Sequence, residues 1–401
     1  MSMRWKGAVI PNPPTVVGPV GGEGGSASGA WTLQTQLQYA GVNGWPKPVI
    51  PKQLWSWGRN DVGELGLGNT TDYSSPKQVG ALTNWSSVSC GQTHTVSIKT
   101  DGTLWSWGYN TRGQLGLNNV TSYSSPKQVG ALTNWSSVAC GVDYTVSIKT
   151  DGTLWSWGYN PYGQLGLAIS YSSPKQVGAL TNWSSVSCGV AHTVSIKTDG
   201  TLWSWGQNNK GQLGLGNITN YSSPIQVGAL TNWSSVSCGY YHTVSIKTDG
   251  TLWSWGYNNY GQLGLNNITN YSSPKQVGAL TNWLSVSCGQ YHTVSIKTNG
   301  TLWSWGYNAQ GQLGLNNVTS YSSPKQVGAL TNWSSVSCGF YHTVSNKTDG
   351  TLWSWGSSQY GQLGLNSTTN YSSPKQVGAL TSWTKLFKGG QTNSTVAIKS
   401  S

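Results

Sequence analysis

Residues 126–157 read PKQVGALTNWSSVACGVDYTVSIKTDGTLWSW, and this stretch returns along the chain with few changes. Its final segment, extended by one glycine to LWSWG, begins at Leu54, Leu104, Leu154, Leu202, Leu252, Leu302 and Leu352. The step is 50 residues and shortens once to 48. A fixed period of this length is typical of proteins in which each repeat is one supersecondary unit.

Each unit predicts four short strands separated by turns, which in residues 126–157 are Pro126–Val129, Ser137–Cys140, Thr145–Lys149 and Thr153–Trp157. Asp151-Gly152 supplies the positive φ that a tight hairpin needs between the last two strands. No helical period of useful length accompanies them. One such meander cannot bury both of its faces, whereas seven packed around an axis can. The sequence therefore predicts an all-β fold, a seven-bladed β-propeller of four-stranded blades.

The two ends of the array predict how the ring closes. Thr395–Lys399 is a third strand with no hairpin after it, and Gln53-Leu54-Trp55 is a fourth strand with no third strand before it. Pairing of these N- and C-terminal strands would complete the last blade and cover both open edges. We expect a propeller over residues 51–401, preceded by an extended Pro/Gly-rich arm over residues 1–50.

Composition and charge narrow the class of protein. Only 8% of the 401 residues are charged, against roughly 25% in ordinary soluble domains, which argues against a coiled coil or a charged tail. The net charge is +12, but 13 of the 22 basic residues fall at two repeated positions, represented by Lys127 and Lys149. Two rings of evenly spaced charge do not match a phosphate backbone, so we do not expect nucleic acid as a partner.

The repeated Cys and His residues do not predict chemistry. The six cysteines occupy one position in successive units, too far apart for disulfides, and read as small buried residues. CGxxH, as at Cys90 and His94, offers two metal ligands per unit rather than four. We expect these histidines to bond backbone groups between strands. A Ser97, His94 and Asp101 triad would repeat around the ring, and the Asp is needed for its turn. We expect no enzyme activity, no metal and no cofactor.

The combination LWSWG, GQLGLG or GQLGLN, SPKQV and VSCGxxHTVSIKTDGT resembles the repeat of the regulator of chromosome condensation family, over Leu54 to Lys399. The founding member of that family is a nucleotide exchange factor for a small GTPase, whose activity depends on an inserted wedge and irregular loops. The units here are near copies without an insertion, so the resemblance implies the propeller and not exchange activity.

The units differ mainly at two dipeptides, one shortly after LWSWG, such as Thr111-Arg112, and one between Cys-Gly and His, such as Tyr240-Tyr241. In the seventh unit we take Gln391-Thr392 as the second pair. Strand parity places both on one face of the ring. The alternative explanation is that exposed loops accumulate sequence changes that have no function. The side chains that we predict to form a ligand-binding face are Arg112, Tyr162, Lys210, Tyr240, Tyr241, Tyr260, Gln290, Tyr291, Gln310, Phe340, Tyr341 and Tyr360.

The N-terminal arm, residues 1–50, predicts attachment to a larger assembly. SGAWTLQTQLQYAGVNGWP (residues 28–46) resembles N-terminal segments of structural proteins from marine bacteriophages. Its docking residues would be Trp31, Leu33, Leu37, Tyr39 and Trp45, on either a strand or a helical turn. The alternative is an ordered strap lying against the propeller.

These features favour a non-enzymatic recognition module in a bacteriophage virion, such as a tail fibre or appendage protein. The arm would bind other virion proteins, and the variable face would bind a host-surface glycan or protein. No secretion signal or membrane span is evident, so we expect synthesis in a host cytoplasm and no membrane insertion. The alternatives are an architectural decoration or neck protein of a virion, and an intracellular scaffold or GTPase regulator of the chromosome condensation regulator type.

Overall fold

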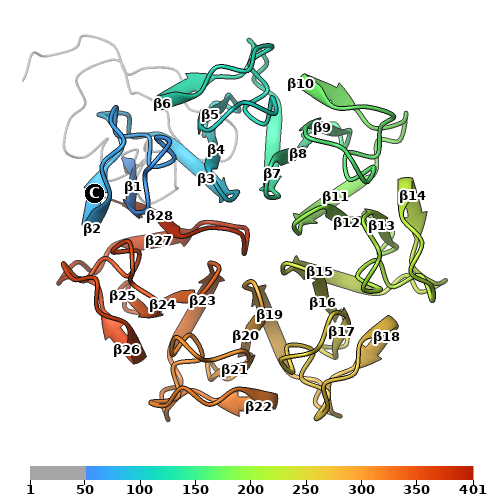
Figure 1. Cartoon of the computed structure of the whole chain (residues 1–401), viewed down its shortest axis with the longest axis vertical. Coiled ribbons are helices and arrows are strands. Elements are labelled where there is room, and N and C mark those ends of the chain that lie inside the picture. The colour runs from blue at the N-terminus through green and yellow to red at the C-terminus, as the bar shows by residue number, and fades with distance from the viewer. Residues whose placement is uncertain (1–50, 401) are drawn as a thin grey trace, which may run out of the picture. The chain divides into compact units, whose positions relative to one another are not determined.

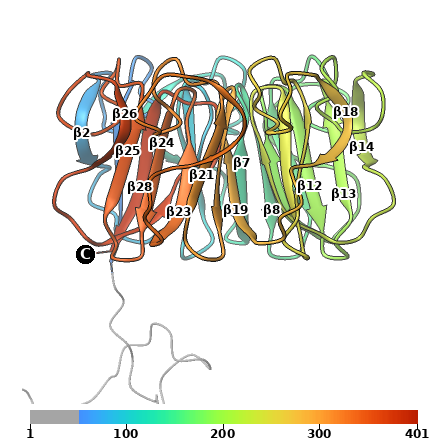
Figure 2. The ribbon, with the colours of Figure 1, turned by 90° about the horizontal axis from the view of Figure 1, so that it is seen from below.

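The computed structural model describes residues 51–400 of the chain. Their strands form seven antiparallel sheets of four strands, arranged as blades around a central axis (Figure 1). In the side view the strands run between two faces of a disc (Figure 2). This confirms the predicted seven-bladed β-propeller. Among the described residues no helix is long and apolar enough to cross a membrane.

We number the blades along the chain and give their strands from the axis outward. Blade 1 holds β3 (Trp85–Cys90), β4 (His94–Lys99), β5 (Leu104–Gly108) and β6 (Tyr123–Gln128). Blade 2 holds β7 (Trp135–Cys140), β8 (Tyr144–Lys149), β9 (Leu154–Gly158) and β10 (Tyr171–Gln176). Blade 3 holds β11 (Trp183–Cys188), β12 (His192–Lys197), β13 (Leu202–Gly206) and β14 (Tyr221–Gln226). Blade 4 holds β15 (Trp233–Cys238), β16 (His242–Lys247), β17 (Leu252–Gly256) and β18 (Tyr271–Gln276).

The remaining blades follow the same order. Blade 5 holds β19 (Trp283–Cys288), β20 (His292–Lys297), β21 (Leu302–Gly306) and β22 (Tyr321–Gln326). Blade 6 holds β23 (Trp333–Cys338), β24 (His342–Lys347), β25 (Leu352–Gly356) and β26 (Tyr371–Gln376). Blade 7 holds β27 (Trp383–Leu386), β28 (Ser394–Ser400), β1 (Lys52–Gly58) and β2 (Tyr73–Gln78).

The grouping of strands into blades differs from the sequence prediction by one strand. Residues 126–157 were predicted to form one sheet, but β6 pairs with β5 of blade 1, and blade 2 begins at β7. The long loop between β5 and β6 brings Lys127 opposite Ser106. The Gly-Ala-Leu-Thr-Asn segment after β6 therefore passes from the outer edge of one blade to the inner edge of the next.

The ring closes as predicted, because β1 and β28 pair along their whole length. Lys52 lies opposite Ser400, Leu54 opposite Ile398, and Gly58 opposite Ser394. Blade 7 therefore combines two N-terminal strands with two C-terminal strands. Both edges that the chain ends would otherwise expose lie inside a four-stranded sheet.

The core lies between blades rather than inside them. One cluster joins Val96 and Ile98 of blade 1 to Trp135 and Trp157 of blade 2. Trp157 is fully buried, and its indole N–H donates to the carbonyl of Gln114 in the preceding blade at 3.0 Å. A single blade cannot bury such a cluster, so the neighbours stabilise each other.

The lysines at the position of Lys149 pack against tryptophans of their own blade. The ammonium of Lys149 lies 3.7 Å from the ring centroid of Trp155 and 4.9 Å from that of Trp135. Six lysines at this position are buried, and each lies over two tryptophans in the same way: Lys99, Lys149, Lys197, Lys247, Lys297 and Lys347. Cation–π contacts of this kind are worth about 0.5–2 kcal/mol each. Both tryptophans belong to the same blade as their lysine, so these charges stabilise individual blades and are not free on the surface.

Candidate binding face

Both variable dipeptides lie in loops at the same end of the strands. The turn between the first and second strands of each blade and the long loop between the third and fourth strands emerge at one end, because the four strands form an antiparallel meander. In blade 1 these loops are residues 91–93 and 109–122. We call this end of the ring the variable face. The Asp-Gly hairpins and the Gly-Ala-Leu-Thr-Asn segments lie at the opposite end.

Repeated polar residues hold the long loop, so its variable side chains remain free. In blade 1, Asn110 accepts from the Leu115 N–H at 2.9 Å and donates through Nδ2 to the carbonyl of Thr121 at 2.9 Å. The backbone N–H of the variable residue Arg112 donates to Oε1 of Gln114 at 2.9 Å. Only backbone atoms of the variable residue take part in this support. Its side chain can therefore change without altering the loop.

The short turns of successive blades are joined around the axis by backbone hydrogen bonds. Val190 donates to Tyr240 O and Tyr240 to Gln290 O, both at 3.4 Å. Gln290 donates to Phe340 O at 3.2 Å, and Phe340 donates to Thr392 O at 2.8 Å. These bonds fix the second variable pair of blades 3 to 7 in one continuous arc.

Eight aromatic rings on this face touch one another in a single cluster, which we call the tyrosine cluster. Tyr240 and Tyr241 are 4.7 Å apart between centroids, Tyr260 and Tyr291 are 5.0 Å apart, and Tyr260 and Tyr307 are 4.9 Å apart. The members of the cluster are Tyr240, Tyr241, Tyr257, Tyr260, Tyr291, Tyr307, Phe340 and Tyr341. They come from blades 4, 5 and 6 and the loops of these blades.

Exposure divides the cluster into a base and a surface. Phe340 is only 6% exposed and supports its neighbours from below, whereas Tyr260 is 38% exposed. Burial raises the pKa of Tyr291 above its ordinary value, and the neighbouring tyrosines add to this effect. The Tyr291 phenol therefore stays neutral at physiological pH and acts as a hydrogen-bonding group on an apolar surface.

The predicted list missed two members of this cluster. Tyr257 and Tyr307 directly follow LWSWG, at a position outside the two dipeptides that the sequence analysis identifies as variable. That position in fact varies along the chain, with Arg59, Gln207 and Ser357 in other units. Comparison of the residue directly after LWSWG in all seven units would have identified Tyr257 and Tyr307 as variable.

Other predicted residues of the face lie outside the tyrosine cluster. Tyr162 is 43% exposed, and the Arg112 guanidinium lies 4.5 Å from the ring of Tyr159. Lys210 lies at the border, 6.0 Å from Tyr257. Gln310 accepts from Asn370 at 2.7 Å, and Tyr360 lies 5.7 Å from the Arg59 guanidinium. The face thus has an aromatic sector and a more polar sector.

The histidines join blades, but not through backbone groups as predicted. Nε2 of His94 lies 3.0 Å from the hydroxyl of Thr145 in the next blade. This hydroxyl already donates to Gln114 O at 2.9 Å, so the histidine must donate through Nε2. The same contact joins His192, His242, His292 and His342 to the next blade. In blade 2 the Tyr144 hydroxyl instead donates to His192 O.

The histidines are buried, neutral rings that pack against the glycine of Cys-Gly. Burial lowers the pKa of each to about 3, and Nδ1 of each has no hydrogen-bond partner. The ring lies directly over the glycine of Cys-Gly: a Cβ on Gly91 would sit 2.5 Å from Nδ1 of His94. No group of three or more His, Cys, Asp or Glu residues that could hold a metal occurs within residues 51–400.

The cysteines of the described chain are all free and buried, as predicted. Sγ of Cys140 lies 3.5 Å from Ser89 O in the preceding blade. Burial raises the pKa of Cys140, Cys238 and Cys288 to about 12. These thiols therefore remain protonated and serve as small packing groups.

Blade 7 departs from the repeat. This corrects the prediction that the units carry no insertion, and it corrects the position of the seventh variable pair. His342 reaches Thr395 across 53 positions, whereas His292 reaches Thr343 across 51, so the loop between β27 and β28 carries a two-residue insertion. The variable pair of blade 7 is therefore Thr392-Asn393 rather than Gln391-Thr392. The bond from Arg59 N to Asn393 O matches that from Tyr109 N to Thr93 O in blade 1.

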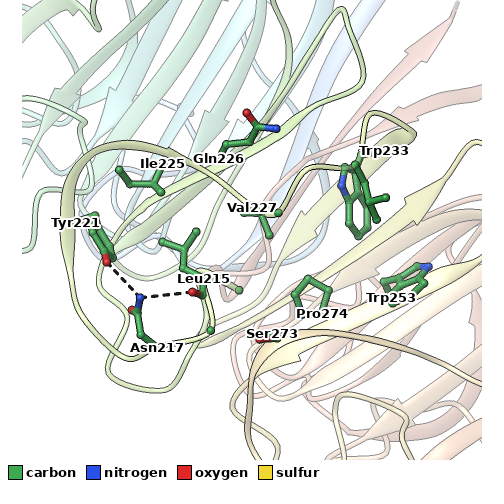
Figure 3. Close-up of a pocket in the computed structure, with 14 residues that line it drawn as sticks. Leu215, Asn217, Tyr221, Ile225, Gln226, Val227, Trp233, Trp253, Ser273 and Pro274 are labelled. Carbon is green, nitrogen blue, oxygen red and sulfur yellow. Dashed lines mark hydrogen bonds between the residues drawn. The ribbon is translucent and has the colours of Figure 1, made fainter.

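A groove lies on the rim between blades 3 and 4 and has a volume of about 500 Å³. Leu215, Ile225, Trp233 and Pro274 are among its lining residues (Figure 3). Asn217 forms one wall, donating to the Tyr221 hydroxyl at 3.2 Å. A similar groove between blades 5 and 6 is lined by the corresponding residues. The residues common to both grooves recur in every unit, so the grooves reflect the framework. Ile225 is specific to the first groove, because the other units have Lys at its position.

The predicted docking residues of the arm, Trp31, Leu33, Leu37, Tyr39 and Trp45, lie outside the described residues. The choice between strand and helix for residues 31–39, and the resemblance of this segment to bacteriophage proteins, therefore stay predictions.

Comparison with known proteins points to one family. The RCC1-like domain pattern matches residues 174–401, and the regulator of chromosome condensation (RCC1) repeat matches residues 53–98, 101–148 and 151–196. Protein RCC2 homolog of Danio rerio is 43% identical over 54 residues, which cover 13% of this chain and 11% of that protein. Protein RCC2 of Mus musculus is 39% identical over a segment of the same length, or 10% of its length.

Solved structures share the fold at low sequence identity. Yeast RCC1 (Prp20), in a crystal structure with Kap60, has a TM-score of 0.78 at 20% identity, covering 88% of this chain and 89% of that one. Human WBSCR16 has a TM-score of 0.77 at 22% identity, covering 87% of this chain and 99% of that one. Prp20p of Saccharomyces cerevisiae, described together with its binding to Gsp1p and histones, has a TM-score of 0.76 at 20% identity, covering 88% and 92%.

Proposed function

This chain belongs to the RCC1-like domain family, and from that premise we propose that it is a non-enzymatic recognition module that binds a protein partner through its tyrosine cluster. The proposal takes up the scaffold or regulator alternative from the sequence analysis. The comparisons give no support to a virion role, so the tail-fibre prediction rests only on the resemblance of the N-terminal arm, and host attachment would use the same variable face. The virion location and the partners of the arm stay predictions.

The observation that carries the proposal is the continuity of the tyrosine cluster. Eight rings from three neighbouring blades form one surface, on a support of backbone bonds that does not depend on their side chains. Tyrosine offers a large contact area at low entropic cost and keeps a hydroxyl for hydrogen bonding. Aromatic residues of this kind carry most of the binding energy at protein interfaces.

Two features favour a protein as the partner. Arg112 and Lys210 lie on aromatic rings in the polar sector and at its border, which would give a hydrophobic centre with a charged rim. Among the structural relatives, yeast RCC1 is bound to Kap60, and Prp20p binds Gsp1p and histones. These partners belong to those proteins, but they show that the same fold accommodates protein ligands.

The test begins with site-specific photo-crosslinking in cells. A photoreactive phenylalanine at Tyr260 should capture a defined protein, whereas the same probe at Leu280, 48% exposed on the opposite end, should not. The captured protein is then purified and its affinity measured. The Y260S/Y291S/Y341S variant should bind about 100-fold more weakly or worse.

The matched control is Tyr109→Ser, because Tyr109 occupies the repeat position of Tyr257 and Tyr307 on the same face but belongs to blade 1, outside the tyrosine cluster. This variant should bind normally. Equal affinity for the triple variant and the original chain, with unchanged tryptophan fluorescence, would reject the proposal.

Family membership also supports a narrower candidate, regulation of a small GTPase. If the captured protein is a GTPase, release of labelled guanine nucleotide should be measured with and without this chain. Accelerated release would make the chain an exchange factor, and binding without acceleration would leave it a scaffold.

A further inference from the structure

A further cavity lies between the innermost strands of blades 1, 2, 6 and 7. These strands surround the axis of the ring (Figure 1). The volume of the cavity is about 440 Å³. The lining comes from β3, β7, β23, β27 and the two residues after β27. It includes Ser86, Ser136, Thr384, Lys385 and Lys388.

The insertion in blade 7 lies across this axis. Gly389 lies against Cys90 O of blade 1, and Gly390 lies against Cys288 O of blade 5, where an added Cβ would sit only 1.9 Å from the oxygen. Phe340 of blade 6 then donates to Thr392 O. The segment therefore touches inner strands on opposite sides of the ring. It covers the axis at the variable face, and the cavity lies alongside it.

Two lysines are the charged residues of the lining, and both belong to the segment where blade 7 departs from the repeat. Register places Lys385 where blade 6 has Ser335, since these residues face Ile398 and Asn346 respectively. No carboxylate belongs to the lining. The cavity therefore has a positive potential and several hydroxyl groups.

The Lys388 ammonium is unusual in having no partner. Lys385 donates to Ser86 O at 2.8 Å. The strand lysines of the repeats lie over tryptophan or tyrosine rings, as Lys347 does over Trp353 at 3.8 Å and Lys375 over Tyr371 at 5.5 Å. For the Lys388 ammonium the described residues provide no hydrogen bond, ion pair or ring contact. Solvent reaches Lys388 through the cavity, although protein atoms of the cavity wall surround its side chain. Its backbone is held by the bond from Cys90 N to Lys388 O at 2.9 Å.

The electrostatics of the pair agree with this geometry. Burial lowers the pKa of Lys388, and the nearby charge of Lys385 lowers it further. Burial also lowers the pKa of Lys385, followed by repulsion from Lys52. No acidic residue offsets either effect. An anion between the two ammonium groups would relieve both the repulsion and the lost hydration.

We propose that this axial cavity is a binding site for a small oxyanion of the phosphate class, held by Lys388 and Lys385 and solvated by the neighbouring serine hydroxyls. Phosphate oxygens accept charge-assisted hydrogen bonds from ammonium groups, and these are the stronger hydrogen bonds of proteins. The site is separate from the tyrosine cluster, so it does not depend on the proposed function.

The test is calorimetric titration of the full chain with inorganic phosphate at constant ionic strength in chloride. Saturable binding at one site per chain is expected, and Lys388→Gln should weaken it about tenfold or more. Lys388→Arg should retain binding, because it keeps the charge. Lys375→Gln removes the same charge from the outer strand β26 and should bind normally.

Titration with O-phosphoserine separates free phosphate from a phosphate ester. Binding of both ligands would assign the site to phosphorylated molecules, and binding of inorganic phosphate alone would assign it to the free ion. The proposal is overturned if no saturable binding occurs. It is equally overturned if Lys388→Gln, folded by tryptophan fluorescence, binds like the original chain, or if Lys375→Gln weakens binding as much.

Discussion

At the scale of single residues, small departures from the repeat show what each position does. Six units have Gln where the first has Glu64. Glu64 Oε2 accepts from the Val62 N–H at 3.0 Å, but its buried Oε1 has no partner. Burial raises the pKa of this carboxyl to about 7. Ionisation of Glu64 therefore costs free energy in the first unit, whereas the neutral Gln of the other six units has no such cost.

Glu64→Gln should stabilise the protein at pH 8 and have little effect at pH 4. The pKa of Glu64 is about 7 in the folded protein and 4.5 in the unfolded chain. Protonated Glu64 therefore does not reduce the free energy of unfolding below pH 4.5, and ionisation reduces it increasingly as the pH rises from 4.5 to 7. The expected gain at pH 8 is roughly 2–3 kcal/mol in the free energy of unfolding. Urea unfolding at both pH values measures it. Gln114→Glu should have the opposite effect, and an equal gain at both pH values would contradict this explanation.

At the scale of elements, the length of the loop between the third and fourth strands affects the next blade. The loop of residues 159–170 is two residues shorter than that of residues 109–122, which accounts for the single 48-residue step. In blade 4, Trp255 donates to Gln212 O at 3.0 Å. In blade 3, which follows the short loop, the buried indole N–H of Trp205 has no acceptor.

This difference predicts unequal costs for one substitution. Trp255→Phe should lose a buried hydrogen bond in addition to packing, whereas Trp205→Phe should lose packing alone. The free energy of unfolding should fall by about 1 kcal/mol more for Trp255→Phe. Denaturant unfolding of the two variants under identical conditions provides the measurement. Equal losses would mean that the indole N–H of Trp255 adds nothing to stability.

At the scale of the whole molecule, the contacts between blades form a ring of acid-sensitive joints. Five joints hold a buried histidine whose pKa is lowered from 6.5 to about 3. The unfolded chain binds these protons near pH 6.5, but the folded ring does not bind them until about pH 3. Stability is therefore present above pH 6.5 and is lost as the pH falls towards 3. Protonation of Glu64 raises the free energy of unfolding as the pH falls, but this is one group against five histidines.

Acidification from pH 7 to pH 5 should consequently destabilise the whole ring. Each histidine should contribute a loss of about 2 kcal/mol. The free energy of unfolding from urea titrations at the two pH values tests this. His292→Tyr, which copies the natural Tyr144 of blade 2, should remove one histidine's share of the loss. An unchanged pH dependence in this variant would show that the acid sensitivity has another source.

The sequence by itself determined the repeat, the seven blades, the pairing of β1 with β28 and the shared face of the variable loops. Each of these follows from local periodicity and strand parity, which hydrogen bonding between adjacent strands enforces. The grouping of β6 with β5 did not follow, because all four strands recur with the same period and any starting strand gives the same pattern.

Only the tertiary structure decided which side chains from different units meet. It placed Tyr257 and Tyr307 among the rings of three blades, His94 against Thr145, and Lys388 beside the axis next to inner strands that are distant in sequence. The physical reason is that the curvature of the ring sets these distances. Curvature arises from the packing of whole blades, and no periodicity within one unit encodes it.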